Sequence, residues 1–308
     1  MNHNTSRSDT DFTAEAGFLK LSLAPSSQLP YSNRPKTTIK CAESKAPLLI
    51  QRALYPEPSY PFLAHIYMMS SAGGILQGDR LNISIESEPH SYASVTTQAS
   101  TKIYRMDRGY ATQQISLRIN KDAYLEFLPH SNIPYKGSKF HQTTSIQADT
   151  GSVLVYSETM SAGRIAFGER FDFNSLELQI TARHSSGKLL FHDSSKFRSM
   201  RNAGQSFNHA AQLDKLFGKR DILSTVYIVS PSSDQTLTGL DEDFFQLLQT
   251  EREFIAKCGS SAKSAFISGI SSLPNNSGLV IRMLSNSIDQ IESVISRVSR
   301  ICRKQFLS

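Results

Sequence analysis

Leu81-Asn82-Ile83-Ser84-Ile85-Glu86 alternates apolar and polar residues along its whole length. Two later stretches repeat the pattern, Ile115-Ser116-Leu117-Arg118-Ile119 and Leu176-Glu177-Leu178-Gln179-Ile180-Thr181. Because successive side chains of a strand point to opposite faces, this period of two predicts strands with one buried face. Further strands are expected at residues 152–157, 188–192 and 225–229, separated by turn residues. The sequence therefore predicts a mainly β fold, a single body of many short strands.

The final third of the chain changes character. Residues 240–308 are predicted to form a small α/β portion in the order α-β-β-α. Its first helix is expected over residues 241–257. Two strands are expected over 265–270 and 279–284, and the segment between them has the composition of a turn.

The clearest helix in the sequence is the last one. Ile288, Ile291, Ile295 and Val298 recur at helical spacing. Ser287 and Gln290 stand three residues apart, the spacing of a capping box. At the other end of the chain, residues 1–14 are polar without periodicity and are expected to be a disordered tail. This leaves residues 15–308 as one predicted domain.

Composition and charge narrow the class of protein. The 308 residues are 39% hydrophobic and carry a net charge of +6, with lysine and arginine scattered rather than clustered. No nucleic-acid-binding signature accompanies this charge. The three cysteines, Cys41, Cys258 and Cys302, are widely spaced and indicate a reducing compartment. No stretch resembles a signal peptide or a membrane span, so we expect a cytoplasmic protein.

Signatures of catalysis are missing from the sequence. It contains no GxSxG, GxxxxGK[ST], HExxH or GxGxxG motif. The eight histidines show no metal-ligand spacing, so neither a tight metal site nor a permanent cofactor is expected. His192-Asp193-Ser194 contains the residue types of a hydrolytic triad, but adjacency in sequence does not bring such side chains together. A strand end running into a polar turn is the better interpretation of these three residues.

Three segments do not fit an ordinary strand or turn. The first, residues 70–81, has three glycines, Gly73, Gly74 and Gly78, directly before Asp79. Glycine permits positive φ or close backbone approach, so a tight loop leading into a strand explains this segment. Residues 95–105, the second segment, alternate without an apolar face, as an edge strand or a polar passage would.

In the third segment, residues 163–171, Gly163 and Gly168 flank a short run of four residues, and Glu169 follows directly. Glu169 could pair with Arg164 or Arg170 on the surface, where such a pair contributes little stability.

Taken in order, these segments resemble the UreD (UreH) family of urease accessory proteins. The family pattern runs GGLVGGDRL, TTPAATKxYR, LExLPQE and GRxAxGExF. This chain has GGILQGDRL at 73–81, TTQASTKIYR at 96–105, LEFLPHS at 125–131 and GRIAFGERF at 163–171. Tyr55-Pro56-Glu57 and the stretch from Leu273 to Leu284 match further family elements. The resemblance extends from about Gly17 to the last helix, with one clear departure: His130-Ser131 replaces the family's Gln-Glu.

The resemblance implies a fold and a function. It implies strands wound helically into one body, with no enzymatic activity. The expected partners are apo-urease and a UreF-type protein that recruits the GTPase UreG, with no nucleic acid or membrane. The expected cargo is Ni²⁺, carried transiently through a polar internal passage to the urease active site.

The same resemblance identifies candidate residues. A passage must hold its ion weakly, which isolated oxygen ligands do better than a cysteine and histidine cage. His130 could replace the family carboxylate because imidazole is a good nickel ligand. The candidate passage residues are Asp79, Glu126, His130 and Glu169. Candidate lining or supporting residues are Thr97, Gln98, Thr101, Lys102, Arg105 and Arg164, and Gly73, Gly74, Gly78, Gly163 and Gly168 are expected to be structural.

Two other classes of protein remain open at this point. One is a β-sandwich module that binds a sugar, peptide or protein and has no connection with urease. The other is a hydrolase with an unrecognised Ser/His/Asp site. The apolar positions of the two C-terminal helices could also form a docking surface, although core packing explains most of them.

Overall fold

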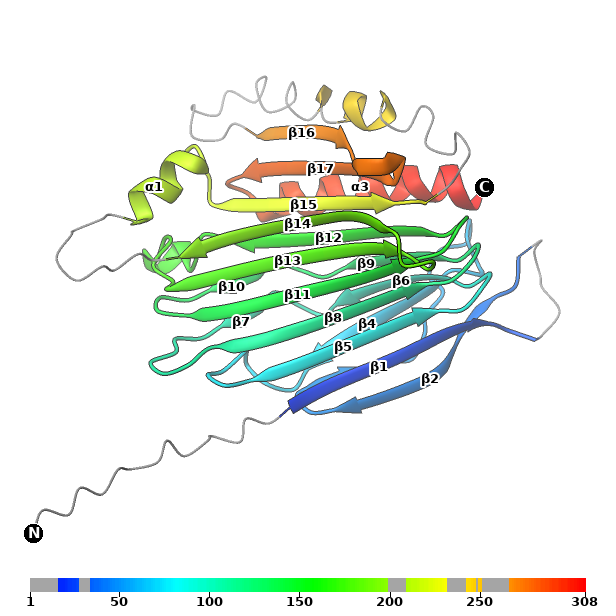
Figure 1. The fold of residues 1–308 in the computed structure, drawn as a ribbon, viewed down its shortest axis with the longest axis horizontal. Helices are drawn as coiled ribbons and strands as arrows, with labels where there is room; N and C mark the ends of the chain where they lie inside the picture. Colours follow the sequence, from blue (N-terminus) through cyan, green and yellow to red (C-terminus); the bar gives the residue numbers. More distant parts are fainter. Residues whose placement is uncertain (1–15, 28–33, 199–208, 232–241, 248, 251–265) are drawn as a thin grey trace, which may run out of the picture.

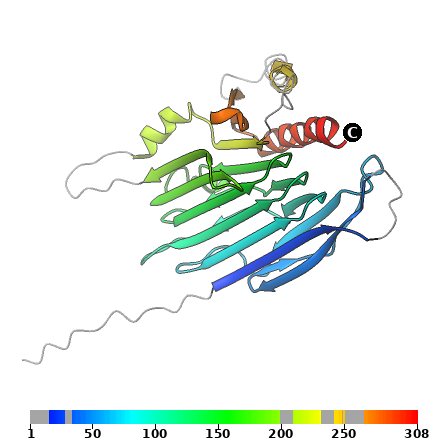
Figure 2. The ribbon, with the colours of Figure 1, turned by 45° about the vertical axis from the view of Figure 1, so that its right-hand side comes forward.

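Two stacked β-sheets form the body of the protein in the computed structural model, which describes residues 16–27, 34–198, 209–231, 242–247, 249–250 and 266–308 (Figures 1 and 2). Sheet A has the strand order β14 (Leu189–Arg198), β13 (Ser175–His184), β11 (Lys139–Ala148), β8 (Ala111–Ile119), β5 (Arg80–Ser87), β1 (Ala16–Pro25) and β2 (Thr37–Lys45). Sheet B has the order β16 (Ile267–Ser272), β17 (Gly278–Ser285), β15 (Ile222–Val229), β12 (Val153–Ser161), β9 (Tyr124–Leu128), β6 (Tyr92–Thr97), β4 (Ala64–Ser70) and β3 (Leu48–Ile50).

The chain winds helically between the two sheets. From β4 to β13 the long strands alternate between sheet B and sheet A, and from β5 onward each lies parallel to the previous long strand of its own sheet. Parallel strands need a crossover, and here the crossover contains a strand of the opposite sheet. In sheet A this winding aligns Ile83 with Ile115, Ile115 with Thr144, and Thr144 with Ile180. The predicted mainly β, helically wound architecture is confirmed.

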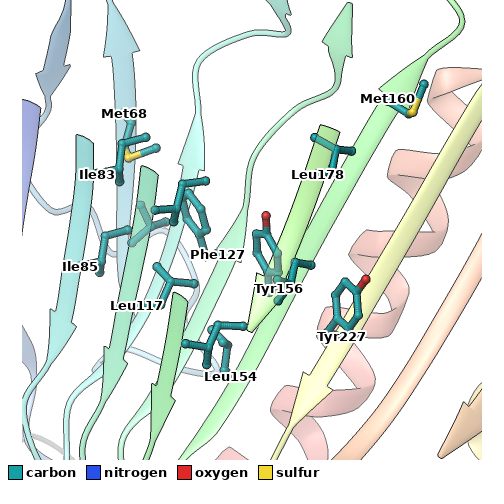
Figure 3. Close-up of a cluster of buried hydrophobic side chains, with 14 of the residues drawn as sticks. Met68, Ile83, Ile85, Leu117, Phe127, Leu154, Tyr156, Met160, Leu178 and Tyr227 are labelled. Atoms are coloured by element: carbon teal, nitrogen blue, oxygen red, sulfur yellow. The ribbon is translucent and has the colours of Figure 1, made fainter. Parts of the chain in front are cut away.

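The main core fills the space between the sheets. In β5 the buried positions are Leu81, Ile83, Ile85 and Ser87, while Arg80, Asn82 and Ser84 are exposed, as the alternation predicts. Met68, Phe127 and Tyr156 approach these side chains from sheet B (Figure 3). Outward-facing positions of sheet A are largely polar, which explains why its strands alternate.

A second core joins the outer face of sheet B to α3 (Ile288–Leu307). In Figure 1 this helix runs alongside β15 and β17. The apolar side of α3 is buried there, so those residues pack in the core rather than remaining free for docking. Ser287 caps the helix, and its hydroxyl accepts from the backbone N–H of Gln290 at 3.3 Å. The Gln290 side chain does not complete a capping box, because its Oε1 accepts instead from the Ser285 hydroxyl at 2.6 Å.

Other predictions at the C-terminal end can be compared with the described residues. Residues 242–247 and 249–250 are helical, while the rest of the expected helix and the start of the strand expected at 265–270 lie outside the described part of the chain, as does the expected tail 1–14. The expected turn contains a short 3₁₀ helix, η3 (Pro274–Asn276), and β15, β17 and β16 extend sheet B itself.

Several strand boundaries were predicted wrongly. The strand expected over 152–157 continues to Ser161, and the one expected over 225–229 begins at Ile222. The strand expected to end at His192 continues to Arg198, since β14 pairs with β13 along its whole length. The residues at 192, 194 and 196 are polar and face outward, so this part of the sequence resembles a turn. They alternate, however, with positions that face sheet B. Within the described residues, no helix is long and apolar enough to cross a membrane.

Candidate functional site

A cavity of about 280 Å³ lies between the two sheets and carries most of the unusual residues of the sequence. Its mouth is formed by the loop after β4, around Gly73 and Asp79, and by residues 97–102 at the end of β6 and the start of β7 (Thr101–Ile103). Its inner end is formed by side chains of β8, β11 and β12, namely Gln113, Gln142, Tyr156 and Glu158. The cavity therefore extends from a surface loop into the interior of the body.

The glycine-rich loop at the mouth is closed by Asp79. Its Oδ2 accepts from the backbone N–H of Leu76 at 2.8 Å, and the side chain also lines the cavity. Position 74 has room only for glycine, because a Cβ there would lie 2.5 Å from the Lys102 carbonyl oxygen. Gly78 has a φ of 85°, which favours glycine. Asp79 thus both closes this loop and lines the cavity.

The opposite wall of the mouth is the polar stretch that the sequence singled out. Thr97, Gln98, Thr101 and Lys102 all line the cavity. Arg105, in contrast, lies outside the lining and pairs with Asp107 at 2.8 Å on the surface. The absence of an apolar face in this segment is explained by its position at the cavity mouth.

Glu158 at the inner end was missed by the sequence analysis. Gln142 Nε2 donates to Glu158 Oε1 at 2.6 Å, and the Tyr156 hydroxyl donates to the same oxygen at 3.1 Å. No lysine or arginine of the described residues pairs with this carboxylate. Burial raises the pKa of Glu158 to about 7, and the charge of Asp193 adds to the rise against the effect of the two hydrogen bonds.

Stacked aromatic rings lie between Glu158 and a second carboxylate, that of Asp193. Tyr156 stacks on Phe127 and on Tyr227, with centroid distances of 5.8 and 6.1 Å (Figure 3). The Tyr227 hydroxyl donates to Asp193 Oδ2 at 2.7 Å, and Arg282 pairs with the same carboxylate. Asp193 is therefore neutralised by an arginine, whereas Glu158 is not.

Glu126 lies on the other face of sheet B and does not line the cavity. It is fully buried beneath α3, where it accepts from the hydroxyls of Tyr124 and Ser299 and pairs with Arg303. Burial alone would raise the pKa of Glu126, but these donors outweigh it and hold the pKa below its ordinary value. The geometry gives Glu126 the role of an anchor for the last helix.

His130 lies in the connection between β9 and β10 (Asn132–Pro134) and lines the cavity. Its backbone N–H donates to Thr97 Oγ1 at 2.9 Å, and its Nδ1 lies 3.4 Å from the same oxygen. Of the four predicted passage residues, the cavity thus brings together Asp79 and His130.

Glu169 is held by Arg164 in the loop after β12. Two nitrogens of the Arg164 guanidinium contact the two carboxylate oxygens, and the Lys136 backbone N–H donates to Oε2 at 3.1 Å. The hydrogen bond from Arg164 lowers the pKa of Glu169. Gly163 (φ 141°) and Gly168 (φ 74°) shape this loop, which contains the 3₁₀ helix η1 (Ile165–Phe167). Neither Arg164 nor Glu169 lines the cavity.

His192 and Asp193 do not form a catalytic pair. His192 is on the outer face of β14, where Nδ1 lies 3.0 Å from the Thr181 hydroxyl oxygen, while Asp193 points inward to Tyr227 and Arg282. Among the described residues, no group of three or more histidine, cysteine, aspartate or glutamate side chains is placed to hold a metal ion. What the cavity offers is a line of single oxygen and nitrogen donors, which suits weak contact with a hydrated cation.

Comparison with known proteins gives the family. The family model described as UreD urease accessory protein matches residues 20–308. A Cenarchaeum symbiosum protein named urease accessory protein UreD is 31% identical over 273 residues, which cover 88% of this chain and 87% of that protein. Proteins named urease accessory protein UreD 2 from Brucella canis and Streptomyces griseus are each 29% identical, covering 91% and 84% of this chain and 87% and 82% of their own lengths. This relationship argues against the alternative of a binding module with no connection to urease. The chain belongs to the UreD family of urease accessory proteins.

Proposed function

We propose that this protein is a non-catalytic scaffold that delivers Ni²⁺ to apo-urease in the cytoplasm. In this role it binds the apo-urease subunits and a UreF-type partner, through which the GTPase UreG joins the complex. The family membership and the names of the relatives support the link to urease, and the resemblance of the four sequence motifs supports the partners.

The cavity between the sheets is the proposed nickel route. The observation that carries this proposal is Glu158, an interior carboxylate that faces the cavity without a cationic partner among the described residues. The other two carboxylates described above, the buried Glu126 and the half-buried Asp193, each have an arginine. A negative charge left without a protein counter-ion attracts a passing cation.

Single ligands along the route suit transit. Asp79 at the mouth, Glu158 at the inner end and His130 on the side wall would each offer one donor to a nickel ion that keeps most of its water. Such contacts hold nickel with a Kd no tighter than about micromolar, so that the ion can leave again. Glu126 and Glu169 are given supporting roles instead, because arginines already neutralise them.

Removal of the protein from a urease expression system tests the function as a whole. The urease structural genes and the other accessory genes are expressed with and without this chain, and the purified urease is assayed for nickel. We expect omission to leave urease assembled but poor in nickel, and an affinity-tagged copy to restore nickel and to co-purify with urease and the UreF-type protein. Full nickel loading without the chain, or turnover of urea by the purified chain alone, would refute the proposal.

A further inference from the structure

A second cavity of about 230 Å³ lies on the far side of sheet B, beneath α3. Its lining includes the hydroxyl-bearing residues Thr96, Ser157, Ser296 and Ser299, together with Arg303. Three residues, Pro129, His130 and Ser157, line this outer cavity and the inner cavity alike. His130 therefore stands at the place where the two cavities approach each other.

The ring of His130 faces a carboxylate in the outer cavity. Its Nε2 lies 3.7 Å from Glu292 Oε1 on α3. Neither side chain is buried, with exposed fractions of 35% for His130 and 43% for Glu292. Within the described part of the chain, His130 is the one basic side chain within ion-pair distance of this carboxylate. A ring nitrogen and a carboxylate thus face each other at the junction.

Thr97 occupies the other ring nitrogen of His130. Nδ1 lies 3.4 Å from the Thr97 hydroxyl oxygen, which also accepts from the His130 backbone N–H. Nε2 is left facing Glu292 Oε1 across 3.7 Å, which is longer than a hydrogen bond. One ion bound to both atoms would span this separation.

We propose that His130 and Glu292 form a relay site for a divalent cation, at which the inner cavity opens toward the outer cavity beneath α3. An ion about 2.1 Å from each ligand atom would span their separation with an N–metal–O angle of roughly 120°. Imidazole and carboxylate are ligands that Ni²⁺ accepts, and two protein ligands with water in the other positions give the weak binding that a relay requires. The inference rests on the proposed function, since it supplies the exit of the proposed nickel route.

His141 provides a matched control for this site. Its Nε2 also lies 3.7 Å from a carboxylate, that of Glu177, and its side chain has the same exposed fraction of 35%. Glu177, however, is already neutralised by Arg198 and Lys196, and His141 lines neither cavity. If a histidine near a carboxylate were sufficient for nickel binding, His130 and His141 would therefore bind Ni²⁺ equally.

The test is a titration of the full-length protein, with its histidine rings isotopically labelled, with NiCl₂ at pH 7.5. Ring signals are followed by NMR, and His130→Gln and His141→Gln identify the two resonances. We expect paramagnetic Ni²⁺ to broaden the His130 signal at concentrations that leave His141 sharp. Glu292→Gln should raise the nickel concentration needed about tenfold or more, with an unchanged thermal unfolding midpoint. Equal broadening of both rings, or no effect of Glu292→Gln, would overturn the relay site.

Co-expression with urease distinguishes a failure of the relay site from a failure of the proposed nickel passage. We expect Glu292→Gln and Glu158→Gln both to lower the nickel content of urease, and His141→Gln to leave it unchanged. Normal loading with Glu292→Gln, together with reduced loading in Glu158→Gln, would overturn the relay and leave the inner passage standing. Normal loading in both variants would remove the passage as well.

Discussion

The guanidinium of Arg303 on α3 contacts both carboxylate oxygens of Glu126 on β9, with Nε 2.8 Å from Oε1 and Nη2 2.6 Å from Oε2. The carboxylate has no exposed surface, and the arginine side chain is 12% exposed. The same arginine pairs with Glu57, in the Tyr-Pro-Glu element of the family resemblance. This contact therefore links the last helix to the outer face of sheet B.

Loss of Arg303 should destabilise the protein strongly. Arg303→Met leaves the charge of Glu126 buried without its partner, which costs about 3–5 kcal/mol of unfolding free energy. Urea denaturation measures the change. Arg300→Ala, an exposed position on the same helix, should stay within about 0.5 kcal/mol of the parent. In the double variant Glu126→Gln/Arg303→Met the loss should be smaller than in Arg303→Met, and a larger loss would argue against the buried charge as the cause.

Glu158 should give the metal-free protein an unusual dependence on pH. The pKa of its carboxyl is raised from 4.5 to about 7 in the folded state, so the folded protein binds the proton more tightly than the unfolded chain. Stability from this group is therefore highest below pH 4.5, falls as the pH rises toward 7, and stays low above it. The difference is on the order of 1–3 kcal/mol.

Glu158→Gln removes this titration and isolates it from other groups. Unfolding free energies of the two proteins, measured by denaturant between pH 4.5 and 8, should diverge as the pH rises, with the variant more stable at pH 8. Parallel curves for the parent and the variant would show that Glu158 titrates in the ordinary range.

Two substitutions separate the roles of Asp79. Asp79→Asn keeps an oxygen that can accept from the Leu76 N–H but removes the charge, whereas Asp79→Ala removes both. We expect Asn to fold normally and to lower nickel delivery to urease, and Ala also to lose about 1–3 kcal/mol of stability by leaving the loop donor unpaired. Delivery that follows stability alone in both variants would make Asp79 purely structural.

Gly74 should tolerate no side chain. A Cβ there would lie 2.5 Å from the Lys102 carbonyl oxygen and 2.7 Å from the Tyr104 ring. Gly74→Ala therefore has to push the loop away from β7, at a cost of about 1–3 kcal/mol. At Gly73 the nearest atom is the Tyr104 hydroxyl at 3.2 Å, the far end of a side chain, so Gly73→Ala should be milder. Thermal unfolding of both proteins provides the comparison, and equal midpoints would contradict the crowding.

The residues that the sequence placed correctly are those with a local signal. Alternation identified β5 and β13 because each buries every second side chain against the core. The helical winding has no such signal, since Ile115 aligns with Thr144 and Thr144 with Ile180 without any repeat of residue types. The family resemblance, rather than periodicity, predicted the winding.

Local sequence patterns did not predict the environments of Glu158 and Glu126. The predicted strand ended at residue 157, one position before Glu158. The alternation of Leu154, Tyr156 and Met160 in the core continues through Glu158, however, and could have identified an inward acid. For Glu126 the pattern of β9 gives the face but not the partner, since Arg303 is 177 positions away along the chain.

The most direct test of the proposed nickel route is the nickel content of urease matured with Glu158→Gln. The variant is co-expressed with the urease structural subunits and the other accessory proteins, and nickel per urease subunit is measured by elemental analysis. Glu43→Gln, an exposed position away from the cavity, is the control. We expect Glu158→Gln to form the complex with urease as the parent does but to load several-fold less nickel, while Glu43→Gln loads normally. Full nickel loading by an assembled Glu158→Gln complex would contradict an internal passage through this cavity.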